Sequence, residues 1–136
     1  MSYNRENLVR AALAARQRSY SPYSDFCVGA ALLCDDGEIF EGANVENASY
    51  GAANCAERTA IFTAIMNGKK DFRAIAIVGA KRGEDVTSIC APCGICRQVM
   101  AEFCGPDFEI LLFDGKEIQV RTLGELLPAA FDKNNL

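Results

Sequence analysis

Apolar residues recur every three or four positions in four segments of the chain, a spacing typical of helices that cover a core. These predicted helices span residues 4–18, 55–67, 93–104 and 122–127. The first ends at the Ser-Pro-Tyr-Ser turn that begins at Ser21, because proline and serine favour turns. The third is expected to direct four apolar residues inward: Ile95, Val99, Met100 and Phe103.

Short apolar runs bounded by turn residues predict five strands. They span residues 28–34, 38–42, 73–80, 108–113 and 117–121. Asp-Asp-Gly joins the first two and Asp-Gly joins the last two, so both pairs are predicted to form hairpins. Strands that alternate with helices indicate an α/β fold with a covered sheet, and the hairpins make that sheet mixed.

The composition is that of an ordinary globular protein. The 136 residues, 50% hydrophobic and 24% charged, are expected to form one domain, 1–136. The net charge of −4 and the scattered basic residues disfavour a nucleic-acid partner. No apolar stretch reaches the roughly 18 residues that cross a bilayer, and no secretion signal is evident. We therefore expect a cytoplasmic protein without nucleic-acid or membrane partners.

Two residue counts narrow the possible chemistry. The chain has seven cysteines and no histidine. An odd number of cysteines without a secretion signal favours reduced thiols, some of them metal ligands, over a disulfide framework. Without histidine, a Ser-His-Asp triad, a Cys-His pair and an imidazole zinc site are excluded. Acid–base chemistry near neutral pH must then use a carboxylate, another titratable side chain or a metal-bound water.

The most specific feature is Cys-Ala-Glu at 55–57 together with Pro-Cys-Gly-Ile-Cys at 92–96. Cys55, Cys93 and Cys96 can supply three thiolates to one Zn²⁺ per chain and leave its fourth position to water, as in catalytic zinc sites. Zinc lowers the pKa of bound water to about 7, so hydroxide can form without histidine. Cys55 and Cys93 both open predicted helices, whose partial positive charge favours the thiolate. Glu57 is the predicted proton carrier.

Residues beside the motif are expected either to stabilise the thiolate ligands or to act as a further ligand. Arg58 is expected to donate to the thiolates and offset their charge, and Gln98 and Arg97 are further candidates for this supporting role. Cys90 forms an overlapping C-x-x-C with Cys93. As a fourth ligand it would close the site and make it structural, an alternative that the sequence leaves open.

Several separated motifs, in the same order, resemble the small homotetrameric cytidine deaminases over almost the whole chain. They are YSPYSDFCVGAA at 20–31, GANVENA at 42–48, CAERTA at 55–60, PCGICRQV at 92–99 and ELLP at 125–128. The resemblance implies a three-layer α-β-α sandwich with a five-stranded mixed sheet. It also implies zinc-dependent hydrolysis of free cytidine and 2′-deoxycytidine to uridine and 2′-deoxyuridine, a step of pyrimidine salvage.

The same resemblance implies roles for individual residues. Asn44 and Glu46 would bind the ribose 3′-hydroxyl, and Phe26 would pack against the pyrimidine. The backbone N–H of Ala56 and the carboxyl of Glu57 would hold the base edge. Glu57 would also take a proton from the metal-bound water, deliver it to N3 and assist the departure of ammonia.

The resemblance further implies a homotetramer. Tyr50 lies in the loop that family members use at subunit contacts, and Phe131 would reach into a neighbouring subunit's site. The match around Phe131 is the least specific, because Ala129-Ala130 only approximates the family's pattern.

Four alternative functions remain open from the sequence. A deaminase of a cytosine-containing antibiotic such as blasticidin S shares the zinc motif, although Glu46 favours the nucleoside enzyme. A polynucleotide deaminase would need a basic channel and usually a helix between the last two strands, where this chain has Asp-Gly. A structural zinc module would need four ligands, and a thiol redox protein would leave Cys55 and Glu57 unexplained.

Overall fold

Five strands form one mixed sheet in the order β2-β1-β3-β4-β5 in the computed structural model, which describes residues 2–136. The strands are β1 (Phe26–Cys34), β2 (Ile39–Ala43), β3 (Phe72–Lys81), β4 (Glu109–Phe113) and β5 (Ile118–Thr122). The helices are α1 (Arg5–Ala15), α2 (Ala56–Met66), α3 (Gly94–Phe103) and the short α4 (Leu123–Leu126). The α/β fold class and the five-stranded sheet predicted from the sequence are thereby confirmed.

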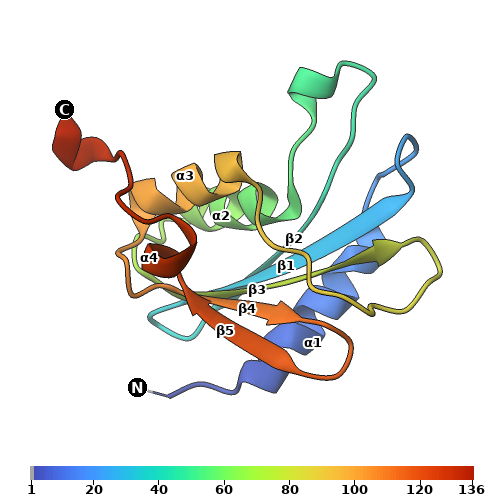
Figure 1. The fold of residues 1–136 in the computed structure, drawn as a ribbon, viewed down its shortest axis with the longest axis horizontal. Helices are drawn as coiled ribbons and strands as arrows, with labels where there is room; N and C mark the ends of the chain where they lie inside the picture. The colour runs from blue at the N-terminus through green and yellow to red at the C-terminus, as the bar shows by residue number, and fades with distance from the viewer. Residues whose placement is uncertain (1) are drawn as a thin grey trace.

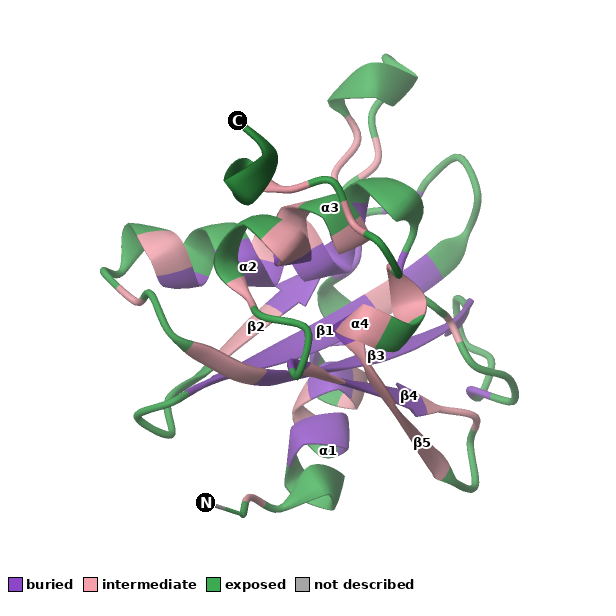
Figure 2. Ribbon diagram, turned by 60° about the vertical axis from the view of Figure 1, so that its left-hand side comes forward, coloured by how far each residue is buried: buried purple, intermediate pink, exposed green. Residues whose placement is uncertain are grey.

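Helices cover both faces of the sheet, which gives the three predicted layers. Figure 1 shows α1 below the sheet and α2, α3 and α4 above it. Side chains alternate along β3: Ile75 and Ile77 are buried beneath α2 and α3, whereas Ala76 and Val78 are buried against α1. Figure 2 shows the central strands as the most buried part of the molecule.

The strand pairing explains why the sheet is mixed. β1 is antiparallel to both β2 and β3, and β4 is antiparallel to β5. Only β3 and β4 are parallel in the described chain, and α3 forms the crossover between them. Both predicted hairpins are confirmed, so β4 and β5 are joined directly without an intervening helix.

Gly42 allows α2 to pack closely against β2. A Cβ atom on Gly42 would lie 2.4 Å from the Ala56 carbonyl oxygen and 2.5 Å from the Ala60 nitrogen. Atoms cannot approach so closely, so only glycine fits at this position. The first turn of α2 is therefore held at a fixed height above the sheet.

Three sequence predictions needed correction. The first helix was predicted to reach Arg18, but α1 ends at Ala15 and a 3₁₀ turn follows at Arg16–Arg18. This happens because the buried Arg16 guanidinium donates to the carbonyls of Cys27, Ala80 and Lys81. Strand β1 begins earlier than predicted, at Phe26, which pairs with Lys81 of β3.

The third correction concerns the apolar stripe of α3. Met100 is fully buried as predicted, and Val99 is partly buried. Ile95 and Phe103, which were also expected to face inward, are 62% and 38% exposed. Among residues 2–136, no helix is both long enough and apolar enough to cross a membrane.

Candidate active site

The starts of α2 and α3 bring three cysteine sulfurs together. Cys55 and Cys93 are the N-cap residues of these helices and have extended backbone conformations, while Cys96 lies in the first turn of α3. The Sγ atom of Cys93 lies 3.7 Å from that of Cys55 and 3.5 Å from that of Cys96. All three sulfurs lie within 4.8 Å of one another.

This spacing fits a tetrahedral metal ion. Ligands at the usual zinc–sulfur distance of about 2.3 Å would lie about 3.8 Å apart around a tetrahedral centre. Cys90 stays outside the group of three sulfurs, and burial raises the pKa of its thiol to about 11. The donor set therefore suits zinc and leaves one coordination position without a protein sulfur.

Arg58 supplies positive charge beside the sulfurs. Its Nη2 donates to Cys55 Sγ at 3.3 Å, and its buried Nε has no hydrogen-bond partner among residues 2–136. The Cys96 thiol and then the Arg58 guanidinium donate hydrogen bonds to Cys55 and lower its pKa to about 5. The pKa of Cys96 is raised by the same hydrogen bond, so one thiolate is stabilised even without a metal.

Glu57 is a buried carboxyl group beside this cluster. It lies in the first turn of α2 and is only 4% exposed. Removal from water raises the pKa of its side chain to about 7. A carboxyl with such a pKa can both hold and release a proton near neutral pH, as a general acid–base catalyst must.

A cavity of about 430 Å³ opens beside the sulfur cluster. It is bounded by the start of α2, the loop before α3 and the loop between β2 and α2. The predicted site residues that line the cavity, together with the alternative ligand Cys90, are Asn44, Glu46, Tyr50, Cys55, Ala56, Glu57, Arg58, Cys90 and Cys93. The predicted metal, proton-carrying and ribose-binding residues are thus brought to one place.

The Glu46 carboxylate accepts three hydrogen bonds from the turn that precedes β1. Its Oε1 accepts from the backbone N–H of Tyr23 at 2.9 Å and of Ser24 at 3.1 Å, and its Oε2 accepts from the Ser24 hydroxyl. The hydrogen bond from that hydroxyl is the main reason why the pKa of Glu46 is lowered. Glu46 therefore fixes the turn in addition to bordering the cavity.

Phe26 is not among the residues that line the cavity, although it lies next to them. Its ring packs over Gly79 of β3, where an added Cβ would come within 2.9 Å of the ring and 3.0 Å of Cys90 Cβ. Phe26 is 36% exposed. The Phe26 side chain is thus packed against the sheet and partly exposed to solvent.

Gln98 and Phe131 meet each other instead of the sulfur cluster. The Gln98 amide donates to the Phe131 carbonyl at 2.8 Å, and the Phe131 side chain is 61% exposed. Arg97 donates to the carbonyls of Pro92 and Leu126. Tyr50 is 79% exposed on the loop that projects above α2 and touches Tyr23 edge to face.

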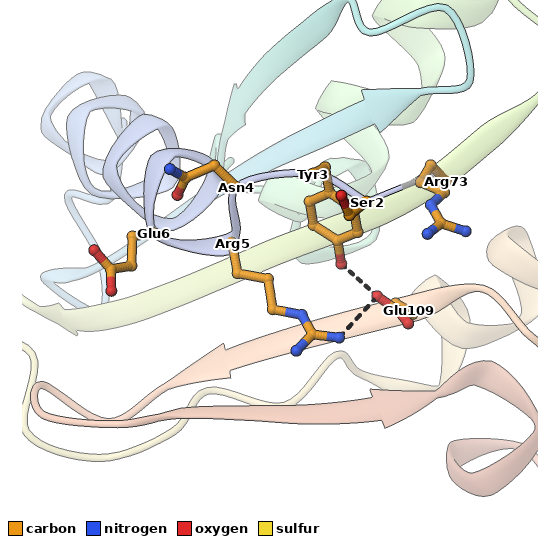
Figure 3. A pocket seen from close by; sticks show the side chains of 7 residues that line it. All are labelled: Ser2, Tyr3, Asn4, Arg5, Glu6, Arg73 and Glu109. Carbon is orange, nitrogen blue, oxygen red and sulfur yellow. Dashed lines mark hydrogen bonds and ion pairs between the residues drawn. The ribbon is translucent and has the colours of Figure 1, made fainter.

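A second cavity, of about 470 Å³, lies at the N-terminal ends of β3 and β4, remote from the cysteines. Figure 3 shows the residues that line it: the segment 2–6, Arg73 of β3 and Glu109 of β4. Glu109 accepts from the Tyr3 hydroxyl and forms an ion pair with Arg5. Glu109 is thus paired with two residues of the N-terminal segment, and none of the cysteines lines this cavity.

Sequence reasoning did not single out Ser19, which contacts the Asn44 side chain. A lone serine after a predicted helix carries no motif, and only the fold shows that it lies beside a residue 25 positions away. It was also not predicted that Cys90 lines the cavity, because its C-x-x-C spacing with Cys93 suggested only a fourth metal ligand.

Comparison with known proteins places this arrangement in a family. The model for the cytidine and deoxycytidylate deaminase zinc-binding region matches residues 2–111. A cytidine deaminase of Halalkalibacterium halodurans is 48% identical over 134 residues, which cover 98% of each chain. A blasticidin-S deaminase of Bacillus cereus is 32% identical over 110 residues, covering 79% of this chain and 78% of its own.

Solved structures agree with the sequence relatives. The crystal structure of cytidine deaminase from Burkholderia pseudomallei superposes with a TM-score of 0.86 at 49% identity, covering 95% of this chain and all of that one. That of cytidine deaminase from Mycobacterium leprae gives 0.79 at 39% identity, covering 93% and 99%. The chain therefore belongs to the cytidine deaminase family of zinc-dependent hydrolases.

Proposed function

We propose that the chain hydrolyses cytidine and 2′-deoxycytidine to uridine and 2′-deoxyuridine with release of ammonia, as a step of pyrimidine salvage. The observation that carries this proposal is the shared cavity of the sulfur cluster and the buried Glu57 carboxyl. The names of the relatives with 46–48% identity support cytidine as the substrate. The blasticidin-S deaminase, at 32% identity, is more distant.

Cys55, Cys93 and Cys96 would hold one Zn²⁺ per chain. A bound zinc ion would supply polarisation of a water molecule at neutral pH. Arg58 would offset the negative charge of the three thiolates, since its guanidinium already donates to Cys55. The starts of α2 and α3 add the partial positive charge of two helix N-termini.

Glu57 would carry the protons of the reaction. Its carboxylate takes one proton from the attacking water and delivers it to N3 of cytosine, while the water oxygen bonds to C4. The carboxylate then accepts the second proton of the added hydroxyl and transfers it to the 4-amino group. The C4–N bond breaks, ammonia leaves, and C4 keeps the oxygen as a carbonyl.

The remaining cavity residues would bind and orient the nucleoside. Asn44 and Glu46 would contact the ribose 3′-hydroxyl, and the Ala56 N–H would hold the base edge. Phe26, whose carbonyl accepts a hydrogen bond from Asn44, would pack against the pyrimidine. The partial exposure of the Phe26 side chain supports this contact.

We also propose that the protein is a homotetramer that acts in the cytoplasm. Tyr50 would lie at a subunit contact, and Phe131 would complete a neighbouring site; the exposure of both side chains supports this. The seven unpaired cysteines suit a reducing compartment.

Metal removal tests the proposal directly. The purified protein should contain one zinc per chain by elemental analysis and should lower the ultraviolet absorbance of cytidine and deoxycytidine. A strong chelator should abolish this change and added Zn²⁺ should restore it, because the three thiolates are the only ligands proposed. Blasticidin S serves as the comparison substrate. Faster turnover of blasticidin S, or full activity without zinc, would contradict the proposal.

A further inference from the structure

The Asn44 side chain is held by three hydrogen bonds that fix the direction of its amide. Its Oδ1 accepts from the Val28 backbone N–H at 2.9 Å and from the Ser19 hydroxyl at 2.5 Å. Its Nδ2 donates to the Phe26 carbonyl at 2.9 Å. A flipped amide would set Nδ2 against the Val28 N–H and Oδ1 against the Phe26 carbonyl, and both contacts would be repulsive.

This arrangement leaves one hydrogen-bonding group of the Asn44 side chain without a partner among the residues that the structure describes. An amide oxygen has two lone pairs, and both are taken by Val28 and Ser19. The amide nitrogen has two hydrogens, and one is taken by Phe26. Because Asn44 lines the cavity, it offers a ligand a single N–H donor and no acceptor.

Ser19 is itself held in a buried polar chain. It is 8% exposed, and its oxygen lies 3.2 Å from the hydroxyl oxygen of Ser21, which is 1% exposed. Since Ser19 has one hydroxyl hydrogen and Asn44 Oδ1 can only accept, Ser21 can donate to Ser19 in return. The Arg82 guanidinium donates to Ser21 at 3.0 Å and forms an ion pair with Asp25.

We propose that Ser19 is a positioning residue for ribose recognition: its hydroxyl occupies the second lone pair of Asn44 Oδ1 and so fixes the remaining N–H towards the substrate hydroxyl. This inference rests on the proposed function, because it takes the 3′-hydroxyl as the group that Asn44 binds. Ser19 lies one hydrogen bond away from the substrate and touches neither the base nor the metal ligands. Its role is therefore confined to recognition of the sugar.

Substrate discrimination provides the test. The unmodified protein should use cytidine with a higher kcat/KM than 3′-deoxycytidine, which lacks the hydroxyl. Ser19→Ala should lower kcat/KM for cytidine about fivefold to tenfold, the worth of one hydrogen bond, through KM more than kcat. It should leave 3′-deoxycytidine almost unchanged. A purely structural serine would affect both substrates equally.

Ser21→Ala is the matched control, because it removes a neighbouring buried hydroxyl that does not contact Asn44. It should preserve the ratio between the two substrates. Ser19→Cys, which keeps a small side chain with a weak donor, should give an intermediate ratio and serves if Ser19→Ala fails to fold. Thermal unfolding of each variant separates stability from recognition.

The outcomes distinguish this inference from the proposed function. An unmodified protein that does not deaminate cytidine would refute the proposed function. An active protein whose substrate ratio is insensitive to Ser19→Ala and Ser19→Cys would overturn only the role of Ser19. A ratio that Ser21→Ala shifts as much as Ser19→Ala does would also overturn it, since no specific role of Ser19 would then remain.

Discussion

Glu57 is buried, and it lies two residues after Cys55, whose sulfur is a candidate metal ligand. A carboxylate that is 4% exposed is costly unless it is protonated or hydrogen-bonded, and burial accordingly raises its pKa to about 7. An apolar side chain would stabilise the fold at least as well at this position, because a buried carboxyl group adds little to the free energy of unfolding. Its chemistry therefore explains its presence better than its contribution to folding does.

Replacing Glu57 by glutamine should separate catalysis from metal binding. Glu57→Gln keeps the shape of the side chain but cannot carry protons, so kcat should fall about 10²–10⁴-fold, the usual worth of a general acid–base group. The zinc content should remain one per chain, because the three thiolates are unchanged. Glu102→Gln, on the exposed surface of α3, is the control and should keep full activity. Turnover of Glu57→Gln within tenfold of the unmodified protein would contradict the assigned role.

At the residue level, the sequence was most informative where spacing alone determines proximity. Two cysteines one helical turn apart, and a third at another helix start, were predicted to meet, and their sulfurs do lie together. Gln98 follows Cys96 by two positions, which is about 200° around the helix, so it points away from the cluster and meets Phe131. The partners of Asn44 and Glu46 come from distant segments, which no local pattern reveals.

At the level of elements, the site depends on where two helices begin. Cys55 and Cys93 precede the first helical residues of α2 and α3, so their extended backbones turn both thiols towards the same point. The height of α2 above the sheet is set by Gly42, which leaves no space for a side chain beneath Ala56 and Ala60. A change in the sheet can therefore displace Cys55 and Glu57 together.

Gly42→Ala should test this coupling. The added methyl group would collide with the backbone of α2, and overpacking of this kind costs about 1–3 kcal/mol of unfolding free energy. Chemical denaturation should show the loss, and kcat/KM should fall with it because the start of α2 moves. Gly51→Ala is the matched control, since a Cβ at Gly51 meets no atom within 4 Å. Equal stability of the two variants would show that α2 is not held by Gly42.

Element types were predictable because periodicity and turn residues are local, whereas element ends depend on partners. The short last helix predicted to begin at Thr122 is present, and Thr122 caps it through a capping box with Glu125. The end of α1 and the start of β1 were misplaced, because the bonds from Arg16 and the pairing of Phe26 with Lys81 arise only in the folded sheet. The order of the five strands was not predicted, since no local pattern encodes it.

For the whole molecule, the exposed apolar side chains are the feature that one chain does not explain. Ile95 and Phe103 follow the helical pattern of a buried face but are exposed, as are Tyr50, Met66 and Phe131. A sequence pattern cannot distinguish a side chain that packs in its own core from one that packs against another subunit, because both are apolar. The proposed homotetramer would give these side chains partners.

A shared site can be tested by combining two defective variants in one assembly. Phe131→Ala should lower activity if Phe131 completes a neighbouring site, and Glu57→Gln removes the proton carrier of its own site. Co-expressed, they should form mixed oligomers in which about a quarter of the sites combine an intact Glu57 with an intact Phe131, since each is drawn from half of the subunits. Activity should then rise above the mean of the two separate variants.

The matched pair Glu57→Gln with Cys55→Ser is the control for this experiment. Both of its defects lie in the same chain's site, so no combination of subunits restores that site. Recovery in neither pair would place Phe131 within its own subunit, where the hydrogen bond between its carbonyl and Gln98 would be its main contact.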